Sequence, residues 1–330
     1  MKIALVGGAG FIGHHLALEL KKWHEPYVLD SLMVNHWCAM QENRKQSWGE
    51  RYLRMLNQRM ELLAETDVPF MFCDARDYHG LSGRFREIRP EVVVHLAAVA
   101  HIDRSKKDPF STFDHSLRTL ENALDASVAL GVGHFIYFSS STVYGNFPKP
   151  TVNENDITKP IGTYSSLKLA GELMVKAYAE DKKLNFTIIR PQALYGPRCI
   201  SRRVTQLFIE NAFDGKPLRV EGDGSAVHDF THVEDVVSGI RAIIEGRDKS
   251  ANETFCLTAG AARTLQDLAE IVQSHIPCEI QYGPPNPDKP SRGTMAVWKA
   301  KRKLGWTPQF HLESGMLDYI QFYREFMKAG

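Results

Sequence analysis

Tyr164 and Lys168 are the residues of this sequence whose types and spacing best suit catalysis. They stand four positions apart, so on a helix both side chains would share one face. A free phenol ionises near pH ~10, too high for a base at neutral pH, but a neighbouring ammonium lowers that pKa. A tyrosine tuned in this way takes a proton from an alcohol and returns it. Because such pairs also arise by chance, the surrounding residues decide whether this one is catalytic.

A second group of residues suits binding of a dinucleotide. Four glycines between positions 7 and 13 follow the apolar run Ile3–Val6 and precede a segment with helical spacing. Glycines at such a turn let the backbone approach a pyrophosphate, which rests on the helix N-terminus. Asp30 ends the next apolar run, where a carboxylate accepts hydrogen bonds from the adenosine ribose and repels a 2′-phosphate. The sequence therefore predicts NAD, bound by Gly7, Gly10, Phe11, Ile12, Gly13 and Asp30.

The elements that must position these groups alternate between strand and helix. The runs typical of buried strands are Ile3–Val6, Tyr27–Asp30, Val68–Cys73, Val92–His95, Phe135–Phe138 and Phe186–Ile189. Helical patterns separate them, which favours an α/β fold with a doubly wound parallel sheet. Beyond residue 190, prolines and glycines interrupt this rhythm, and a last helix is expected over about 312–328. We predict an NAD-binding domain of residues 1–190 with about 229–257, and a smaller α/β substrate-binding lobe of residues 191–228 and 258–330.

Composition argues against several classes of partner. Forty basic and thirty-nine acidic side chains in 330 residues give a net charge of +1, so no global field favours nucleic acid or a membrane surface. No apolar run approaches the ~18 residues of a membrane span. The chain enters its first apolar run directly after Met1 and Lys2, without a targeting pattern. Five scattered cysteines form neither a disulfide framework nor a metal-ligand spacing, so we expect a cytoplasmic protein without a metal.

Taken together, these residues give the chain a resemblance to the extended short-chain dehydrogenase/reductases, in the branch of NAD-dependent nucleotide-sugar epimerases and dehydratases. The resemblance runs nearly from end to end and implies a Rossmann fold. The stretches that carry it are, in chain order, Gly7–Gly13, Asp30, Cys73–Asp74, His95–Ala98, Phe138–Gly145, Tyr164–Lys168, Arg190–Pro191, Tyr195–Pro197, Gly222–Gly224, Asp229–Asp235 and Leu304–Trp306. So many motifs in one order are specific to this family.

The resemblance implies a role for each matching residue. Tyr164 would be the acid/base, Lys168 would hold the nicotinamide ribose, and Ser140 would hydrogen-bond the reacting sugar hydroxyl. Asp74 would bind the adenine amino group. The other residues expected to line the cofactor are Ala75, Leu96, Ala97 and Ala98. The nucleoside-diphosphate sugar would be bound by Ser140, Ser141, Thr142, Tyr164 and Arg292, with the arginine on the diphosphate.

Plainer roles remain open for some of these residues. Ser139–Ser141 would be an ordinary polar strand end if Tyr164 were absent. Arg292 lies in a charged, proline-rich region and would also suit a solvated surface position. Tyr195 and His95 fit packing better than catalysis.

Ser141 and Thr142 bear on the choice of reaction. In the 4,6-dehydratases these positions usually hold Asp and Glu, which protonate the leaving 6-hydroxyl and remove the C5 proton. Hydroxyl side chains do not act as carboxylic acids, although the stretch His95–Ser105 looks more like the dehydratases. We expect C4 epimerisation of a nucleoside-diphosphate hexose or uronic acid through a 4-keto intermediate. A dehydratase or 4-keto-sugar reductase is the alternative, and an NAD-sensing regulator is less favoured because such proteins typically lose the Tyr/Lys pair.

The sequence departs from the family pattern at several positions. Ser116 and Ala193 replace asparagines, and His228 replaces an arginine. Each lost contact to a buried diphosphate would cost ~1–3 kcal/mol, unless one of four arginines compensates: Arg292, Arg198, Arg202 or Arg203. An insert around Asn35–Gly49 would be a lid, a partner surface or decoration. The family resemblance also implies a homodimer through helices around 103–130 and 164–180.

Overall fold

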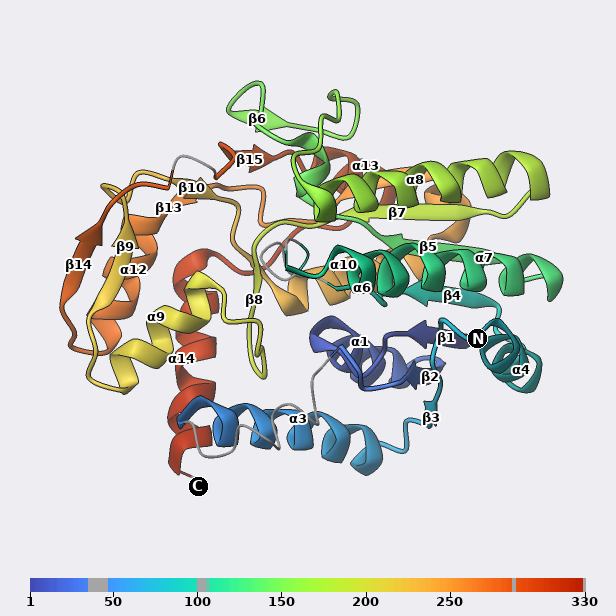
Figure 1. Ribbon diagram of the computed structural model, residues 1–330, viewed down its shortest axis with the longest axis horizontal. Coiled ribbons are helices and arrows are strands. Elements are labelled where there is room, and N and C mark those ends of the chain that lie inside the picture. Colours follow the sequence, from blue (N-terminus) through green and yellow to red (C-terminus); the bar gives the residue numbers. More distant parts are fainter. Residues whose placement is uncertain (35–46, 100–104, 106, 287–288, 329–330) are drawn as a thin grey trace.

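A parallel sheet forms the centre of the protein, for which the computed structural model describes residues 1–34, 47–99, 105, 107–286 and 289–328 (Figure 1). Within those residues the sheet has seven strands. Their spatial order is β12 (Glu253–Cys256), β7 (Phe186–Arg190), β5 (His134–Phe138), β4 (Val92–His95), β1 (Lys2–Val6), β2 (Glu25–Asp30) and β3 (Phe70–Phe72). The doubly wound Rossmann arrangement predicted from the sequence is therefore confirmed.

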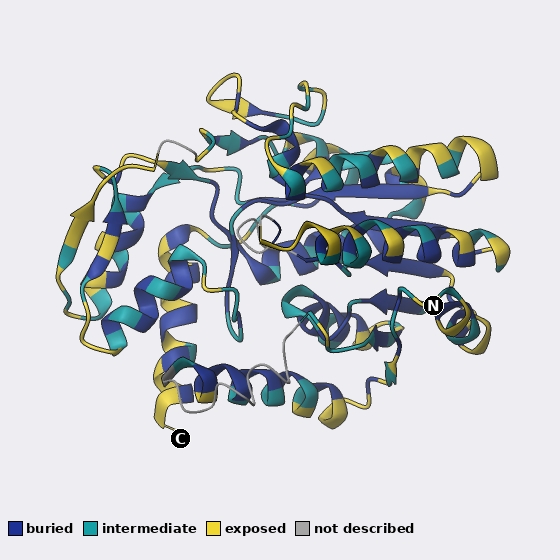
Figure 2. Cartoon of the chain, viewed as in Figure 1, coloured by how far each residue is buried: buried dark blue, intermediate teal, exposed yellow. Residues whose placement is uncertain are grey.

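Helices cover both faces of this sheet, which explains why its strands are continuous apolar runs. One face carries α1 (Phe11–Lys21), α10 (Val233–Glu245), α11 (Arg247–Ser250) and α13 (Trp298–Leu304); the other carries α4 (Tyr78–Ile88), α6 (Pro109–Phe113), α7 (Thr119–Ala129) and α8 (Thr163–Lys182). Alternate residues of β1 enter the two cores, Ile3 and Leu5 on the α1 side and Ala4 and Val6 on the other. Figure 2 shows the central strands buried along almost their whole length.

A further apolar core lies beyond the carboxyl ends of the strands. Its elements are α9 (Val204–Phe213), β9 (Leu218–Glu221), α12 (Leu265–His275), β14 (Ile280–Gly283) and α14 (Leu312–Lys328). Short strand pairs join this lobe to the sheet: β8 (Leu194–Tyr195) with β11 (Thr231–His232), β10 (Val227–His228) with β13 (Arg263–Thr264), and β6 (Thr151–Val152) with β15 (Thr294–Met295). The lobe is placed to cover the sheet edge where ligands of such folds bind.

Helix α3 (Ser47–Glu65) joins the lobe although it lies between β2 and β3 in the chain. Tyr52 and Met55 belong to the core of the lobe. The Tyr52 hydroxyl donates to Glu210 at 2.8 Å, and Arg51 pairs with Asp214 at 2.8 Å. The expected boundaries of the two domains remain a prediction. Residues 35–46 of the insert lie outside the described residues, as do 100–104 of the dehydratase-like stretch.

Strand β3 is shorter than the run Val68–Cys73 suggested. The Val68 amide donates to the Leu63 carbonyl at 2.9 Å, which closes the end of α3, and Pro69 has no N–H to give to a ladder. The C-terminal helix has the expected extent. Among the described residues, none of the helices is long and apolar enough to cross a membrane, and His, Cys, Asp and Glu side chains form no metal-binding group.

Candidate active site

The glycine turn meets the end of β4 at the place where the strand order reverses. Gly7 has a φ of +83°, and a Cβ there would lie 2.6 Å from the Ala97 amide nitrogen, so a glycine is required. Because β1 lies between β2 and β4, the turn opens at the topological switch point of the sheet. Gly10 is the N-cap of α1 and has no side chain to occupy the free amides of the first turn. Those amides suit a pyrophosphate.

Asp30 braces this turn from the end of β2. Its carboxylate accepts hydrogen bonds from the amides of Ala9 at 3.1 Å and Leu32 at 2.7 Å. Burial raises the pKa of Asp30, and the two amides oppose that rise. A carboxylate at this position and a turn without side chains fit the ribose and pyrophosphate of NAD.

Asp74 lies beyond β3 and is already bound within the protein. Arg76 contacts both carboxylate oxygens, with its Nη2 2.6 Å from Oδ2, and it also reaches Asp114 at 3.2 Å. Hydrogen bonds from Arg76 hold the pKa of Asp74 below its usual range. The backbone of Ala75 accepts a hydrogen bond from Asn122 at 2.9 Å. The adenine-binding role of Asp74 stays a prediction, and its carboxylate would have to serve Arg76 and adenine together.

The structure brings Tyr164, Lys168 and Ser140 together at the carboxyl end of β5. Tyr164 and Lys168 lie one turn apart in α8, and both are buried. The Ser140 side chain lies close enough to Tyr164 to lower its pKa. Ser140 is also the N-cap of the short 3₁₀ helix η2 (Ser141–Tyr144), and it accepts hydrogen bonds from the amide and hydroxyl of Thr142, the latter at 3.0 Å. Three of the predicted residues thus form one cluster.

The electrostatics of this cluster differ from the expectation that Lys168 depresses the pKa of Tyr164. Burial raises the pKa of Tyr164, while Arg203 and Ser140 oppose the rise. The Lys168 ammonium donates instead to the Phe138 carbonyl at 2.7 Å. Burial lowers the pKa of Lys168 to about 8. In this structure the expectation is therefore wrong, because desolvation dominates at Tyr164 and the lysine is directed to the backbone.

Arg292 lies close to the same cluster rather than in solvent. Its Nη1 donates to the Gly145 carbonyl at 2.7 Å, and its guanidinium carbon lies 5.6 Å from the centre of the Phe147 ring. Burial lowers the pKa of Arg292 to about 10. Burial, followed by Arg292 and other cations, lowers the pKa of His228 to about 4, so the imidazole is neutral at pH 7. The plainer interpretation of Arg292 as a solvated arginine does not fit.

A cavity of about 360 Å³ continues from His228 into the lobe. Its polar wall includes Arg202, Arg219, His228 and Lys289, and its apolar wall includes Val204 and Phe208. Arg203 precedes α9 and acts electrostatically on both Tyr164 and His228. The cavity and the catalytic cluster are thus neighbours.

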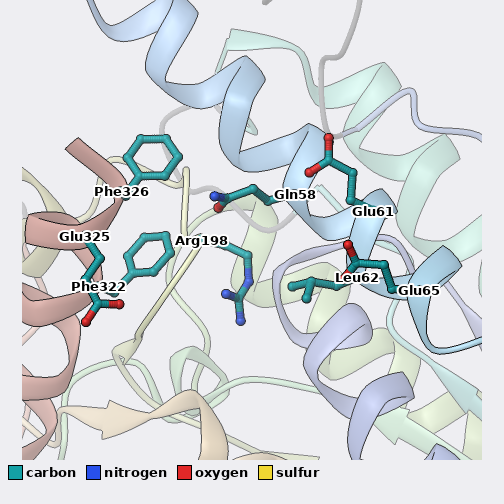
Figure 3. A pocket seen from close by; sticks show the side chains of 8 residues that line it. All are labelled: Gln58, Glu61, Leu62, Glu65, Arg198, Phe322, Glu325 and Phe326. Atoms are coloured by element: carbon teal, nitrogen blue, oxygen red, sulfur yellow. The ribbon is translucent and has the colours of Figure 1, made fainter. Parts of the chain in front are cut away.

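Arg198 belongs to a different part of the molecule. Figure 3 shows its side chain in a separate cavity of about 340 Å³ between α3 and α14. The guanidinium carbon lies 5.6 Å from the centre of the Phe322 ring, and Nε lies 3.0 Å from His14 Nε2. Of the four arginines considered from the sequence, Arg292, Arg202 and Arg203 lie near the lobe cavity and Arg198 does not.

Two positions that depart from the family pattern lie beside the site. Ser116 is buried in a π-helical turn, η1 (Asp114–Arg118), which contacts α8. Ala193 has a φ of +43°, and its carbonyl accepts a hydrogen bond from the Thr231 amide at 3.3 Å. Position 193 therefore contributes a backbone turn, and it has no side-chain amide that could contact a ligand.

Known proteins combine these two features, a glycine turn that suits a dinucleotide and a cluster of Tyr, Lys and Ser. The sequence pattern of the NAD dependent epimerase/dehydratase family matches residues 3–257. The chain belongs to this family. The family predicted from the motifs is confirmed, and so is NAD as the cofactor of that family.

The relatives of this chain include both epimerases and dehydratases. A UDP-glucose 4-epimerase of Mycolicibacterium smegmatis is 30% identical over 74% of this chain and 79% of the relative. The solved UDP-glucose 4-epimerase of Thermotoga maritima, with UDP-glucose, is 28% identical, covers 99% of this chain and 100% of that one, and has a TM-score of 0.85. The dTDP-glucose 4,6-dehydratase of Streptomyces venezuelae, with NAD bound, is 26% identical, covers 98% and 97%, and has a TM-score of 0.83. Overall similarity alone therefore does not separate the two reactions.

The sequence analysis did not predict two parts of the site. The first is Arg219, which lines the lobe cavity and lies in β9, where nothing local marks it as a ligand. The second is the buried pair Glu172–Arg190 behind Lys168. Its signal was available, because Glu172 follows Lys168 at the helical spacing that separates Lys168 from Tyr164.

Proposed function

We propose that this protein is an NAD-dependent nucleotide-sugar 4-epimerase, acting on a nucleoside-diphosphate hexose or uronic acid through a 4-keto intermediate. The observation that carries the proposal is the set of side chains around Tyr164. Thr142 donates its hydroxyl to Ser140, and Ser141 is buried with its amide bound to the Pro191 carbonyl at 2.8 Å. These are the positions at which the dehydratases carry acids, and hydroxyls do not replace a carboxylic acid at neutral pH.

Tyr164, Lys168 and Ser140 each have a separate role in a reversible oxidation at C4 of the sugar. Bound NAD would supply removal of the C4 hydride and its return. Tyr164 receives the proton of the 4-hydroxyl and gives it back, while Ser140 holds that hydroxyl by a hydrogen bond. Lys168 is charged below its pKa of about 8, and its ammonium, held by the Phe138 carbonyl, would bind the nicotinamide ribose of NAD. A 4-keto sugar that turns its other face before reduction leaves as the C4 epimer, with no net oxidation.

A continuous path of residues from the catalytic cluster into the lobe supports our proposed position for the nucleotide. Helix η2 leads from Ser140 to Gly145, whose carbonyl holds Arg292. Arg292 and Arg203 both act on His228, at the wall of the lobe cavity. We assign the diphosphate to Arg292 and Arg203 with Arg202, which replace the contacts missing at Ala193 and His228. The nucleoside then occupies the cavity against Val204 and Phe208.

A dehydratase or a 4-keto-sugar reductase is the alternative on the same scaffold. Dehydration would need an acid and a base near C5 and C6 from residues other than Ser141 and Thr142. A reductase would consume one reduced cofactor for each turnover. A non-catalytic NAD sensor would not need the buried cluster of Tyr164, Lys168 and Ser140.

One experiment separates these reactions. The purified protein is incubated in D₂O with UDP-, dTDP-, GDP- and CDP-sugars, without added cofactor, and products are analysed by NMR and mass spectrometry. An epimerase inverts C4 and leaves the C5 hydrogen unlabelled. Accumulation of a 4-keto-6-deoxy sugar carrying deuterium would instead identify a dehydratase. Turnover that appears only when reduced cofactor is added would identify a reductase.

We also propose a homodimer through α6 and α8, which contact each other. Phe110, Phe113 and Leu173 are exposed on these helices, and Phe110 is 82% exposed. Apolar side chains gathered in this way mark an interface. Light scattering should show a dimer that Phe110→Asp with Leu173→Asp converts to a monomer, while Ile157→Asp, at an equally exposed position, does not. A wild-type monomer would contradict the proposal. Residues 103–104 and 106 of the predicted interface lie outside the described residues.

A further inference from the structure

Helix α8 holds the catalytic serine segment by a ladder of side-chain contacts. The Tyr137 hydroxyl donates to the Lys168 carbonyl at 3.4 Å, and Lys168 Nζ donates to the Phe138 carbonyl at 2.7 Å. The next contact is between Ser139 and Glu172, where the serine hydroxyl donates to Oε1 at 2.6 Å. Ser140 then lies near Tyr164 and lowers its pKa. Residues 137–139 are thus hydrogen-bonded to one face of α8, next to Ser140.

Glu172, like Tyr137 and Ser139, takes no part in the reaction proposed above. It follows Lys168 by one turn, and its side chain is wholly buried. Arg190, at the end of β7, binds both of its oxygens, with Nε 2.9 Å from Oε1 and Nη2 2.6 Å from Oε2. A buried carboxylate is tolerated only when it is paired and hydrogen-bonded in this way.

Arg190 extends the contact to the far end of η2. Its Nη1 donates to the Tyr144 hydroxyl at 2.8 Å and to the Glu154 carbonyl at 3.2 Å. Tyr144 in turn donates to the Asn153 carbonyl at 2.9 Å. The pair therefore touches both ends of the segment 139–144 that carries Ser140, Ser141 and Thr142.

We propose that Glu172, clamped by Arg190, is a positioning residue for the reaction: it fixes the serine segment through Ser139 and supplies the negative charge that keeps Lys168 protonated. The inference rests on the proposed hydride-transfer site, but not on the identity of the sugar. The two effects can be tested separately, because only the fixing of the serine segment depends on Ser139, and only the protonation of Lys168 depends on the charge of Glu172.

The groups that face Lys168 support the second effect. From α8 these are Tyr164 and Glu172, from β5 the ring of Tyr137, 5.2 Å from Nζ, and from β4 His95. Burial raises the pKa of Tyr137 and lowers that of His95 to about 3, so both are neutral at pH 7. Burial lowers the pKa of Lys168, and Glu172 opposes that effect.

Two variants test the two effects without leaving a buried charge unpaired. Ser139→Ala removes the anchor and keeps the ion pair. Glu172→Leu combined with Arg190→Met removes both charges of the pair, a replacement that often preserves folding. Ser127→Ala is the matched control, since Ser127 is a buried serine of α7 whose hydroxyl donates to the Ala123 carbonyl at 2.6 Å. The sugar nucleotide turned over best by wild type is the substrate, and kcat, KM, bound NAD and the melting temperature are measured between pH 6 and 10.

Ser139→Ala should lower kcat about tenfold with KM within about twofold, because the acid/base groups are misplaced while substrate binding is kept. Its pH profile should match that of wild type. The double variant should show the same loss of kcat, and the alkaline limb of its kcat/KM profile should move down by about one pH unit. Both should retain NAD and melt near the wild-type temperature.

The proposal is overturned if both variants keep wild-type kcat, or if the double variant keeps the wild-type alkaline limb. Equal losses in Ser127→Ala would show that the effect is general destabilisation. Failure of the proposed function is a separate result, since wild type would then turn over none of the sugar nucleotides. In that case the effect of the Ser139 anchor is measured by hydrogen exchange of the Ser140 and Thr142 amides in the holoprotein. Faster exchange in Ser139→Ala supports the positioning role, and unchanged exchange refutes it.

Discussion

Replacing Arg292 by methionine should weaken binding of the nucleoside diphosphate while leaving binding of the nucleoside unchanged. In the structure the guanidinium lies over Phe147, is held by the Gly145 carbonyl at 2.7 Å, and faces a neutral His228. Hydrogen bonds to charged groups contribute ~1.5–3 kcal/mol. Loss of the contact with a diphosphate should therefore raise the dissociation constant by roughly 10- to 150-fold. Methionine keeps the apolar contact with the ring, so the change is mainly electrostatic.

The assay is isothermal titration calorimetry with paired ligands. The nucleoside diphosphate that binds wild type best among UDP, dTDP, GDP and CDP is compared with its free nucleoside. Arg292→Lys should give an intermediate loss with the diphosphate, because it keeps the charge but not the two-pronged geometry. Arg302→Met is the matched control: Arg302 also stacks on an aromatic ring, Trp298, 5.5 Å away, but lies on α13.

Two results would refute the reasoning about Arg292. Equal weakening of nucleoside and diphosphate would mean that the arginine supports the shape of the cavity rather than the phosphates. Unchanged affinity for the diphosphate would mean that Arg203 and Arg202 bind it without Arg292.

Three further outcomes follow from the site and its supports. Tyr164→Phe should reduce turnover by at least ~10²-fold, since the phenol is the proposed acid/base, with the dissociation constant for NAD within twofold of wild type; retained turnover would refute the mechanism. Gly13→Ala should lower the affinity for NAD in a fluorescence titration, because its Cβ would lie 2.5 Å from the Gly8 carbonyl oxygen, whereas Gly83→Ala in α4, with no atom within 4 Å, should not. Burial raises the pKa of Asp229 to about 6 from an ordinary 3.8, so the stabilisation linked to its protonation is complete below pH ~4 and is lost as pH rises through 6. The stability of wild type relative to Asp229→Asn, measured by urea unfolding, should fall by about 2 kcal/mol between pH 4 and pH 7, and a flat difference would contradict the assignment.

The parts of the fold that sequence predicted are those in which local pattern and tertiary burial agree. Val92–His95 and Phe135–Phe138 are continuous apolar runs because both faces of each strand are covered, and such runs are visible without a structure. The spacing of Tyr164 and Lys168 is likewise a local property of one helix. The glycine turn could be predicted because only glycine at position 7 can approach the backbone of Ala97 without a clash.

The parts that sequence could not predict depend on contacts between distant segments. The direction of Lys168 toward the Phe138 carbonyl depends on the packing of α8 against β5. The cavity that receives Arg202 and Arg219 is closed by Lys289 and Leu265, more than forty positions away in the chain. The pKa of Tyr164 depends on its depth below the surface, which composition does not reveal.

Helix α3 bears on how this scaffold can be recombined. Tyr52 and Met55 complete the core of a lobe whose other buried residues come from Tyr195 onward. A chimaera that moved residues 191–330 alone to another NAD-binding sheet would leave that core without two large side chains and the Glu210 carboxylate without the Tyr52 hydroxyl. The proposed substrate-binding unit is therefore discontinuous in the sequence, and moving it to another NAD-binding sheet would require residues 47–65 to accompany residues 191–330.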